Sequence, residues 1–303
     1  MRRRELLGGL IGFAFGCGRR GVVDEAKRQR DRPAPVTAAV EPRTSVRVLS
    51  YNVLADELAV DRRIPALMQG MERARPDVLA LQEVAPWFLD QMAARKWLRS
   101  FEVAQIDGRL ARPNGQLIAS RLPTRATRSR QLPGAQGRTV LITHVELGPG
   151  ERLCVATTHM ESYLDDGPIR AAQFDAIFAE LAAERDDPEV VATVFCGDLN
   201  FGDGEQPDSA HLDPEFVDLW TALRPGEPGY TWNIERSEMA RAGSFVGEPS
   251  RRIDRILLRS RSWRPKAIEI IGDQPVEPGD RSLFPSDHFG LIGEIERDAE
   301  PRE

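Results

Sequence analysis

The segment Val194-Phe195-Cys196-Gly197-Asp198-Leu199-Asn200 is an apolar run that ends in glycine and then places an acid and an amide two residues apart. Residues i and i+2 of an extended chain point to the same side, so we expect Asp198 and Asn200 to project together from the end of a buried strand. A carboxylate beside a neutral amide suits the handling of a water molecule and a phosphate oxygen. The alternative for this segment alone is a strand that ends in an ordinary Gly-Asp turn, so the other strand ends must decide.

Polar side chains accompany several further predicted strands. These are 46–52 ending in Asn52, 78–83 ending in Glu83, 153–158 followed by His159, 252–258 containing Asp254, and 289–295 preceded by Asp287 and His288. Any one of them could be an ordinary turn, because turns favour such residues. Strand ends of packed sheets converge on one rim, however, so the repetition indicates that these side chains form a site.

Helical patterns separate these strands. The first helix is expected to start at a capping Asp61 and to end at Arg75-Pro76-Asp77, and others are expected over 86–97, 169–183 and 213–223. Pro214 would then occupy the first helical position of the last of these, after Asp213 as its cap.

The chemistry open to such a set of side chains is limited. The sequence contains no Ser-His-acid or Cys-His nucleophile pattern and no phosphate-binding loop of the GxxxxGK type. Carboxylates with an amide suit Mg²⁺ or Mn²⁺, which prefer oxygen ligands and keep several waters. Two histidines that donate hydrogen bonds suit the oxygens of a phosphoryl transition state. Together they predict metal-assisted attack of water on phosphorus.

Six short motifs, taken in order, resemble those of the endonuclease/exonuclease/phosphatase superfamily across residues 46–296. They are Ser50-Tyr51-Asn52-Val53, Leu81-Gln82-Glu83-Val84, Thr158-His159, Gly197-Asp198-Leu199-Asn200, Arg252-Ile253-Asp254-Arg255 and Ser286-Asp287-His288. The resemblance implies an α/β fold, a four-layer αββα sandwich in which two mainly antiparallel sheets pack face to face between flanking helices.

Within the superfamily, further stretches are similar to the 5′-tyrosyl-DNA phosphodiesterase family. They are Thr158-His159-Met160-Glu161-Ser162, Asp218-Leu219-Trp220, Tyr230-Thr231-Trp232 and Phe284-Pro285-Ser286-Asp287-His288. The chain departs from that family at Gly202, where the family carries an arginine, and at 114–118, which lacks the family's aromatic residue. Both departures fall in substrate-facing regions.

The resemblance implies a Mg²⁺ ion, with Mn²⁺ as a substitute, as the cofactor. Glu83 would bind the metal directly, and Asn52 and Asp287 would lie nearby as ligands or as partners of ligands.

The resemblance also implies the catalytic roles. Asp198 would orient or deprotonate the attacking water, and Asn200 would hold that water and a phosphate oxygen. His159 and His288 would donate to the phosphate as negative charge builds up, and Asp254 would orient His288. Orienting an imidazole through one nitrogen fixes which proton the other nitrogen presents.

Three residues are predicted to bind substrate. Ser162 belongs to a motif shared with the family, Arg138 closes an Arg-rich stretch (121–138), and Trp232 could stack on a base or an aromatic leaving group. A second Arg-rich stretch covers 251–266. If these stretches follow a row of phosphates, salt should weaken binding steeply; the alternatives are solvated arginine faces and a buried Trp232.

The start of the chain has the pattern of an export signal. Arg2-Arg3-Arg4 precedes an apolar segment, 6–16, that is too short to span a bilayer, and Arg3-Arg4 resembles a twin-arginine signal. Ala14-Phe15-Gly16-Cys17 resembles a lipobox. We therefore expect an exported lipoprotein anchored in the membrane through Cys17 and facing the periplasm or the cell exterior; without a working signal it would be cytoplasmic.

The 303 residues, 41% of them apolar, suffice for one large core, and the net charge of −6 does not by itself indicate a nucleic-acid partner. The expected organisation is an export signal (1–17), a disordered linker (18–44), a catalytic domain (45–297) and a tail (298–303). Cys154 and Cys196 are expected to be buried free thiols, because no Cys-x-x-Cys spacing occurs.

Three functions are compatible with these features. The first is a monomeric, metal-dependent phosphodiesterase that acts on nucleic-acid ends, as in the 5′-tyrosyl-DNA phosphodiesterase family. The second is an exported nuclease or a lipid or sugar phosphohydrolase with the same chemistry, which the export signal favours. The third is a catalytically inactive binding module on a lipid anchor, which has no need of the full set of catalytic residues.

Overall fold

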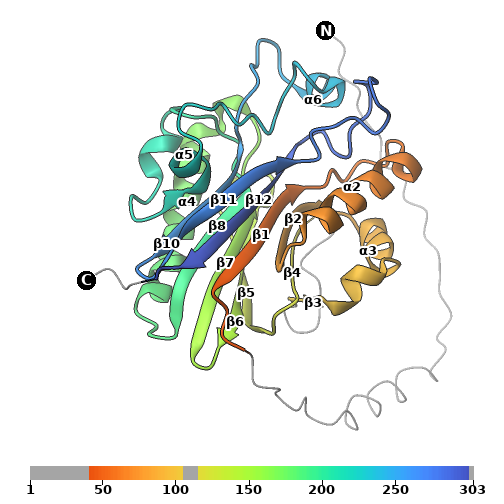
Figure 1. Cartoon of the computed structure of the whole chain (residues 1–303). Coiled ribbons are helices and arrows are strands. Elements are labelled where there is room, and N and C mark those ends of the chain that lie inside the picture. Colours follow the sequence, from red (N-terminus) through yellow and green to blue (C-terminus); the bar gives the residue numbers. More distant parts are fainter. Residues whose placement is uncertain (1–40, 105–114, 300–303) are drawn as a thin grey trace, which may run out of the picture. The chain divides into compact units, whose positions relative to one another are not determined.

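The computed structural model describes residues 41–104 and 115–299, and these form two six-stranded sheets packed face to face between helices (Figure 1). Export, lipidation at Cys17 and the linker up to residue 40 concern residues outside the described ones. Cys154 and Cys196 are buried free thiols, as predicted. Among the described residues, no helix is long and apolar enough to cross a membrane.

The first sheet has the strand order β11-β12-β1-β2-β4-β3, and the second has the order β5-β6-β7-β8-β10-β9. The strands of the first sheet are β1 (Ser45–Asn52), β2 (Val78–Val84), β3 (Glu102–Val103), β4 (Gly115–Ser120), β11 (Trp263–Ile271) and β12 (Gly290–Arg297). The strands of the second are β5 (Thr124–Gln131), β6 (Thr139–Gly148), β7 (Glu151–His159), β8 (Val190–Asp198), β9 (Val217–Asp218) and β10 (Asp254–Ser260). Only the pairs β1–β2 and β7–β8 run parallel among these strands, so both sheets are mixed but mainly antiparallel.

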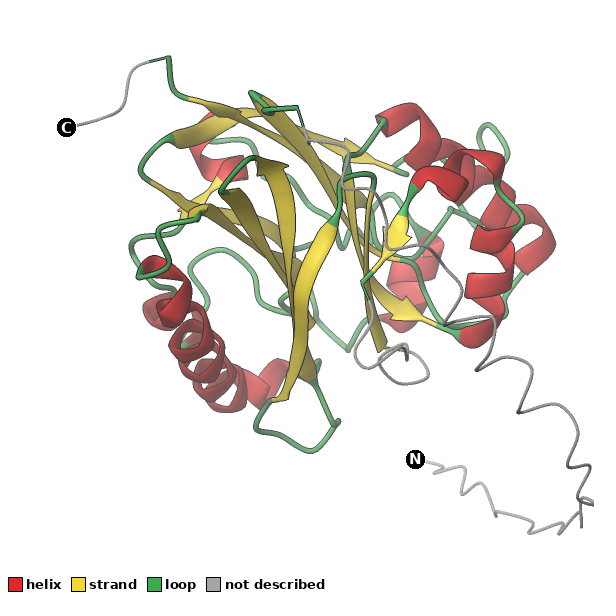
Figure 2. Cartoon of the chain, turned by 90° about the horizontal axis from the view of Figure 1, so that it is seen from below, coloured by secondary structure: helices red, strands yellow, loops and turns green. Residues whose placement is uncertain are grey.

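Helices cover the outer faces of the two sheets (Figure 2). Helices α2 (Val60–Ala74) and α3 (Pro86–Ala93) pack on the first sheet, and α4 (Gly167–Ala182) packs on the second. The shorter α5 (Leu219–Leu223) and α6 (Glu238–Gly243) lie in the long connection before β10. The predicted four-layer αββα sandwich is therefore confirmed.

Both faces of the central strands are buried, which explains their nearly continuous apolar sequences. Val48 and Val194 point into the core between the sheets. Their neighbours Leu49 and Phe195 point outward, under the helices. Successive side chains of a strand alternate between faces, so each such strand contributes to two cores. Burying one side chain of this size contributes about 1.5–3 kcal/mol.

The two parallel pairs bring four strand ends to one rim. Asn52 lies beside Gln82 in the β1–β2 register, and His159 lies beside Asp198 in the β7–β8 register. Gly197 has a φ of 144°, and a Cβ there would lie 2.1 Å from the carbonyl oxygen of Thr158. Only glycine permits this approach, so the residue before Asp198 is fixed by the packing of β8 on β7.

Candidate active site

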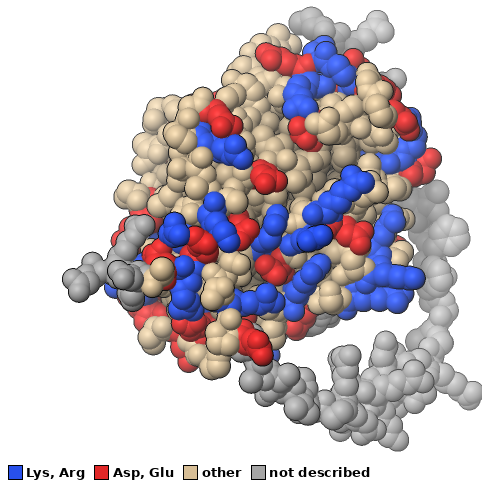
Figure 3. Space-filling view, in the orientation of Figure 1, with Lys and Arg blue, Asp and Glu red and all other residues tan. Residues whose placement is uncertain are grey.

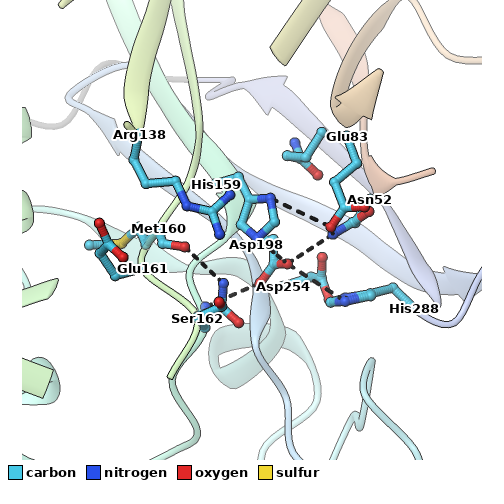
Figure 4. Close-up of polar contacts among 12 residues, drawn as sticks. Asn52, Glu83, Arg138, His159, Met160, Glu161, Ser162, Asp198, Asp254 and His288 are labelled. Atoms are coloured by element: carbon cyan, nitrogen blue, oxygen red, sulfur yellow. Dashed lines mark hydrogen bonds and ion pairs between the residues drawn. The ribbon is translucent and has the colours of Figure 1, made fainter. Parts of the chain in front are cut away.

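Seven of the predicted residues meet at this rim, and Figure 4 shows six of them pointing toward a common centre. Strand ends or the residues directly after them supply Asn52, Glu83, His159, Asp198 and Asn200, while Asp254 begins β10 and His288 precedes β12. The β8–β10 register places Asp254 opposite Asp198. Glu83 is the most exposed of the seven, with 28% of its side chain accessible, and the other six are buried.

Asn52 links two carboxylates. Its Nδ2 donates to Oε1 of Glu83 and to Oδ2 of Asp198, both at 3.0 Å. Its Oδ1 accepts the backbone N–H of Leu54 at 3.1 Å, which fixes the orientation of the amide. Glu83 has a φ of 57°, a left-handed conformation uncommon for a residue other than glycine, and its Oε2 accepts the N–H of Ala55. The amide therefore holds the two carboxylates in fixed positions.

Asp198 stands at the centre of the cluster, with 1% of the residue exposed. Besides Asn52, its Oδ2 faces Nε2 of His159 at 3.3 Å and Nε2 of His288 at 3.6 Å. Its Oδ1 accepts the backbone N–H of Asn200 at 3.2 Å. Asn200, with a φ of 56°, donates its Nδ2 to the carbonyl oxygen of Met160. Asn200 thus lies beside Asp198, but a left-handed turn after the end of β8 places it there, not the extended backbone that the sequence predicted.

The two histidines differ in charge. Nδ1 of His288 donates to Oδ2 of Asp254 at 2.9 Å. Burial alone would lower the pKa of His288, but Asp254 and Asp198 raise this pKa well above the usual value. Burial lowers the pKa of His159 to about 3, against the pull of Asp198 and with the help of Arg138 and His288. At neutral pH, His288 is a cation and His159 is neutral.

The carboxylates at the open side of the cluster fit a hard cation. Burial raises the pKa of Asp287, and the negative charge of Glu83 adds to this rise. Within the part of the chain that the structure describes, Oδ1 of Asp254 is buried without a hydrogen-bond partner. Glu83 and Asp287 repel each other and are both partly exposed, an arrangement that suits a divalent ion such as Mg²⁺.

Arg138 and Ser162 reach the same rim from the second sheet. The guanidinium of Arg138 is directed toward His159 and Asp198 (Figure 4). Burial lowers the pKa of Arg138, while the charges of Asp198 and Glu83 oppose that shift. Oγ of Ser162 accepts from Nε2 of Gln136 at 3.0 Å. Two of the three predicted substrate-binding residues thus lie on this rim, and their roles stay predictions.

Trp232 lies behind His288. Only 7% of it is exposed, and its ring centroid is 4.9 Å from that of His288 at an interplanar angle of 56°. Of the two alternatives for Trp232, a substrate-stacking ring and a buried ring, the structure shows the buried one. Its packing restricts the movement of the His288 imidazole, whereas contact with substrate stays a prediction.

The Arg-rich stretches are occupied by ion pairs with acids. Five pairs illustrate this: Arg125–Glu146, Arg128–Glu184, Arg130–Glu180, Arg251–Glu248 and Arg252–Asp218. Arg255 also pairs with Asp218, at 2.9 Å, and is buried. Figure 3 shows the same interleaving of basic and acidic side chains on one face of the molecule. These pairs, rather than a row of free guanidinium groups, explain the two stretches.

His144 lies in a separate group on the second sheet, away from the cluster around Asp198. Its Nε2 lies 2.6 Å from Oε2 of Glu184, and its Nδ1 faces Arg152. Cys154 brings its sulfur within reach of both side chains. Since Arg128 and His144 already pair with the acid of this group, it is better explained as a buried ion-pair network than as a metal site.

Three residues that shape the site were not predicted. Oγ1 of Thr231 accepts the N–H groups of Ile253 and Asp254 at 3.2 and 3.0 Å, which fixes the start of β10. Gln136 and Glu161 hold the loop that carries Arg138. Thr231 and Glu161 lie within motifs already compared with the family, and Gln136 lies between Gly134 and Gly137, residues that are typical of turns. Neither signal revealed the contacts.

The chain matches the model of the Endonuclease/Exonuclease/phosphatase family over residues 49–288. Tyrosyl-DNA phosphodiesterase 2 of Gallus gallus is 28% identical over 260 residues, which cover 82% of this chain and 66% of that protein. The human protein of the same name is 26% identical over 72% of this chain and 58% of its own length. The chain therefore spans somewhat less than two thirds of these relatives.

Solved structures agree with this match. The crystal structure of D. rerio TDP2 complexed with single strand DNA product has a TM-score of 0.67 at 26% identity, covering 84% of this chain and all of that one. The human Nocturnin catalytic domain with bound sulfate anion, at 18% identity, has a TM-score of 0.65 and covers 85% of this chain and 95% of that one, which shows a shared fold. With the motif residues at one rim of this sandwich, the chain belongs to the Endonuclease/Exonuclease/phosphatase family.

Proposed function

We propose that the chain is a metal-dependent phosphodiesterase that hydrolyses phosphodiester bonds at nucleic-acid ends, including 5′-phosphotyrosyl DNA, by in-line attack of water. The observation that carries this proposal is the arrangement of Asn52, His159 and His288 around one buried carboxylate, Asp198. Support for the substrate comes from the names of the similar proteins and from the DNA product in the zebrafish structure.

The water would be handled by Asp198 and Asn200. Asp198 is shielded from bulk water, so its carboxylate interacts strongly with a nearby proton. Its neighbour Asn200 is held by the carbonyl oxygen of Met160, so both side chains are in place before substrate binds. Such preorganisation lowers the cost of bringing water in line with phosphorus.

The histidines would stabilise the charge that develops on the phosphoryl oxygens. His288 is a cation whose direction is fixed by Asp254, so its Nε2–H faces the reaction centre. His159 is neutral and supplies a second donor without adding repulsion to Arg138. Hydrogen-bond donors that are fixed in a site that excludes water stabilise negative charge more strongly than the same donors in solution.

Glu83 and Asp287 would hold the metal, with Asn52 fixing the orientation of Glu83. When bound there, Mg²⁺ would act as a Lewis acid that offsets charge on the phosphoryl group. The ion would also offset the repulsion from Glu83, which adds to the effect of burial in raising the pKa of Asp287.

We further propose export and lipid anchoring of a monomer, which would place the substrate outside the cytoplasm. The support is the arginine-rich start at 2–4 and the apolar segment before Cys17. This setting favours a second candidate with the same chemistry, a scavenging nuclease or a lipid or sugar phosphohydrolase. Replacing Cys17 by Ser should move the protein from the membrane to the soluble fraction; retention in the membrane would contradict anchoring at Cys17.

A substrate panel tests the function. The full chain with Mg²⁺ is incubated separately with 5′-phosphotyrosyl DNA, plain single- and double-stranded DNA, RNA, a choline phospholipid and a sugar phosphodiester, with Asp198→Asn as the control for contaminating hydrolases. Release of tyrosine or nucleotides by the wild type alone supports the proposal. Turnover of the lipid or the sugar ester alone would replace the nucleic-acid substrate by the second candidate.

A further inference from the structure

We infer that Gln136 is a positioning residue that directs Arg138 at the reaction centre and, being neutral, leaves its positive charge available for the anionic part of the substrate. This inference rests on the proposed phosphodiesterase function and adds to it a residue that sets anion affinity.

Gln136 joins Arg138 and Ser162, two of the three predicted substrate-binding residues. Its Oε1 accepts Nε of Arg138 at 3.0 Å and also accepts from Nη2 of the same guanidinium. Its Nε2 donates to Oγ of Ser162 at 3.0 Å. With one edge of the guanidinium tied to the amide, Nη1 has no hydrogen-bond partner among the described residues. The group is directed toward the cluster, as Figure 4 shows, so Nη1 can donate there. One amide thus sets the orientation of both side chains.

The loop that carries Gln136 is itself held from below. Oε1 of Glu161, a residue with 1% exposure, accepts the N–H of Gln136 at 2.8 Å. Gln173 of α4 donates to the carbonyl oxygen of Pro133 at 2.7 Å and accepts the N–H of Glu161 at 3.1 Å. A Cβ at Gly134 would lie 2.1 Å from Oε1 of Glu161, so the loop closes over the carboxylate only because residue 134 is glycine. The position of Gln136 is therefore built into the fold.

The neutrality of Gln136 distinguishes Arg138 from the arginines near it in sequence. Arg125, Arg128 and Arg130 all form ion pairs with carboxylates. No such pair joins Arg138 to an acid among residues 41–104 and 115–299; its hydrogen-bond partner is an amide. An amide accepts the same hydrogen bonds as a carboxylate without cancelling the charge. The charges of Asp198 and Glu83 act on Arg138 from a distance, but neither forms an ion pair with it. A phosphate oxygen can therefore accept from the N–H groups of Arg138 that Gln136 leaves unused.

Two substitutions separate position from charge. Gln136→Glu keeps the acceptor and nearly the same shape but forms an ion pair with Arg138, so anion affinity should fall while the fold is kept. Gln136→Met keeps the side-chain volume at position 136 and leaves the charge of Arg138 unpaired, but it removes the hydrogen-bond acceptor. Arg138 should therefore lose its fixed direction. Gln69→Glu is the control, because it makes the same net-charge change on an exposed position of α2.

The experiment measures hydrolysis of the p-nitrophenyl ester of thymidine 5′-monophosphate by the full chain with Mg²⁺, together with inhibition by inorganic phosphate and the thermal midpoint. For Gln136→Glu we expect KM and the phosphate Ki to rise about tenfold, which corresponds to about 1.4 kcal/mol, with an unchanged midpoint. For Gln136→Met we expect a loss mainly in kcat with a smaller change in Ki. Gln69→Glu should behave as the wild type.

Unchanged KM and Ki in Gln136→Glu would overturn the inference. Equal losses of activity and phosphate affinity in both variants, together with a lowered thermal midpoint, would also overturn it, because they would show that Gln136 contributes only packing. Phosphate binding measured by calorimetry separates this result from a failure of the proposed function. If the wild type binds phosphate but cleaves no phosphodiester, the function is wrong, and weaker binding by Gln136→Glu still supports the charge role of Gln136.

Discussion

The position of each side chain in this site is set by the hydrogen-bond and ion-pair partners of its polar atoms. Oδ2 of Asp198 faces nitrogens of Asn52, His159 and His288, and its other oxygen accepts a backbone N–H. The sequence predicted the identity of these residues because their motifs are local. It could not predict that Asn52 would join Asp198 to Glu83, because that contact connects residues 146 and 31 positions away.

Replacing Asp198 by Asn should lower kcat by about three orders of magnitude or more, because the amide has the shape of the carboxylate but cannot accept a proton from water. The thermal midpoint should change little, since the amide oxygen still accepts from neighbouring nitrogens. Steady-state kinetics and a thermal melt of the same sample check both statements. Turnover close to that of the wild type would remove Asp198 from the mechanism.

At the scale of elements, local patterns found the strands that build the rim but not all of their neighbours. The predicted helix over 213–223 is wrong in its first half: Val217–Asp218 forms β9, which pairs with β10, and only α5 is helical. The predicted helix over 86–97 ends at Ala93. Val217–Asp218 belongs to a segment with helical propensity, yet it pairs with β10 at the edge of the second sheet. This pairing depends on a tertiary contact that the local sequence does not reveal.

Arg63 of α2 ties two loops of the site together. The fully buried guanidinium donates to five carbonyl oxygens, including those of Val53 and Pro285 at 2.9 and 3.0 Å. Arg63→Met should destabilise the protein by about 3 kcal/mol or more, because these buried carbonyls lose their partner. Denaturant unfolding measures this loss. The control Arg62→Met removes an exposed pair with Glu277 and should change stability by no more than about 0.5 kcal/mol; equal effects would contradict the role of Arg63.

The buried Glu184 under β6 should make stability depend on pH. Burial alone would raise its pKa, but hydrogen bonds from His144 and Arg128 outweigh burial and hold the pKa below the usual range. A carboxyl with a lowered folded-state pKa stabilises the protein above its unfolded pKa of about 4.3 and loses this contribution as pH falls through the folded value. The thermal midpoint of Glu184→Gln should therefore lie below that of the wild type at pH 7 and approach it under acid conditions. A gap that stays constant with pH would contradict the assignment.

For the whole molecule, the site exists because two sheets place strand ends from distant parts of the chain on one rim. Its residues run from Asn52 to His288, and the family model spans nearly the same interval. The resemblance predicted the sandwich and the motif residues. The conformation of the loop between β5 and β6 was not predictable, because its turn residues do not indicate that Glu161, which follows β7, supports it.

Metal binding should be visible without turnover. An ion held by Glu83 and Asp287 binds only the native state and should raise the thermal midpoint with increasing Mg²⁺, by the equivalent of about 2.7 kcal/mol at a hundredfold excess over Kd. EDTA should reverse the rise. Glu83→Gln should abolish it, and Glu72→Gln, an exposed acid on α2, should not. The same rise in Glu83→Gln would show that the ion binds elsewhere.

The central claim is that a water molecule, activated beside Asp198, attacks phosphorus. Hydrolysis of a 5′-phosphotyrosyl oligonucleotide by the full chain with Mg²⁺ in ¹⁸O-labelled water, followed by mass spectrometry of both products, tests it directly. The predicted result is one ¹⁸O in the terminal phosphate of the DNA and none in the released tyrosine, with no product from Asp198→Asn. Label in the tyrosine, or equal product from the variant, would contradict attack of this water on phosphorus.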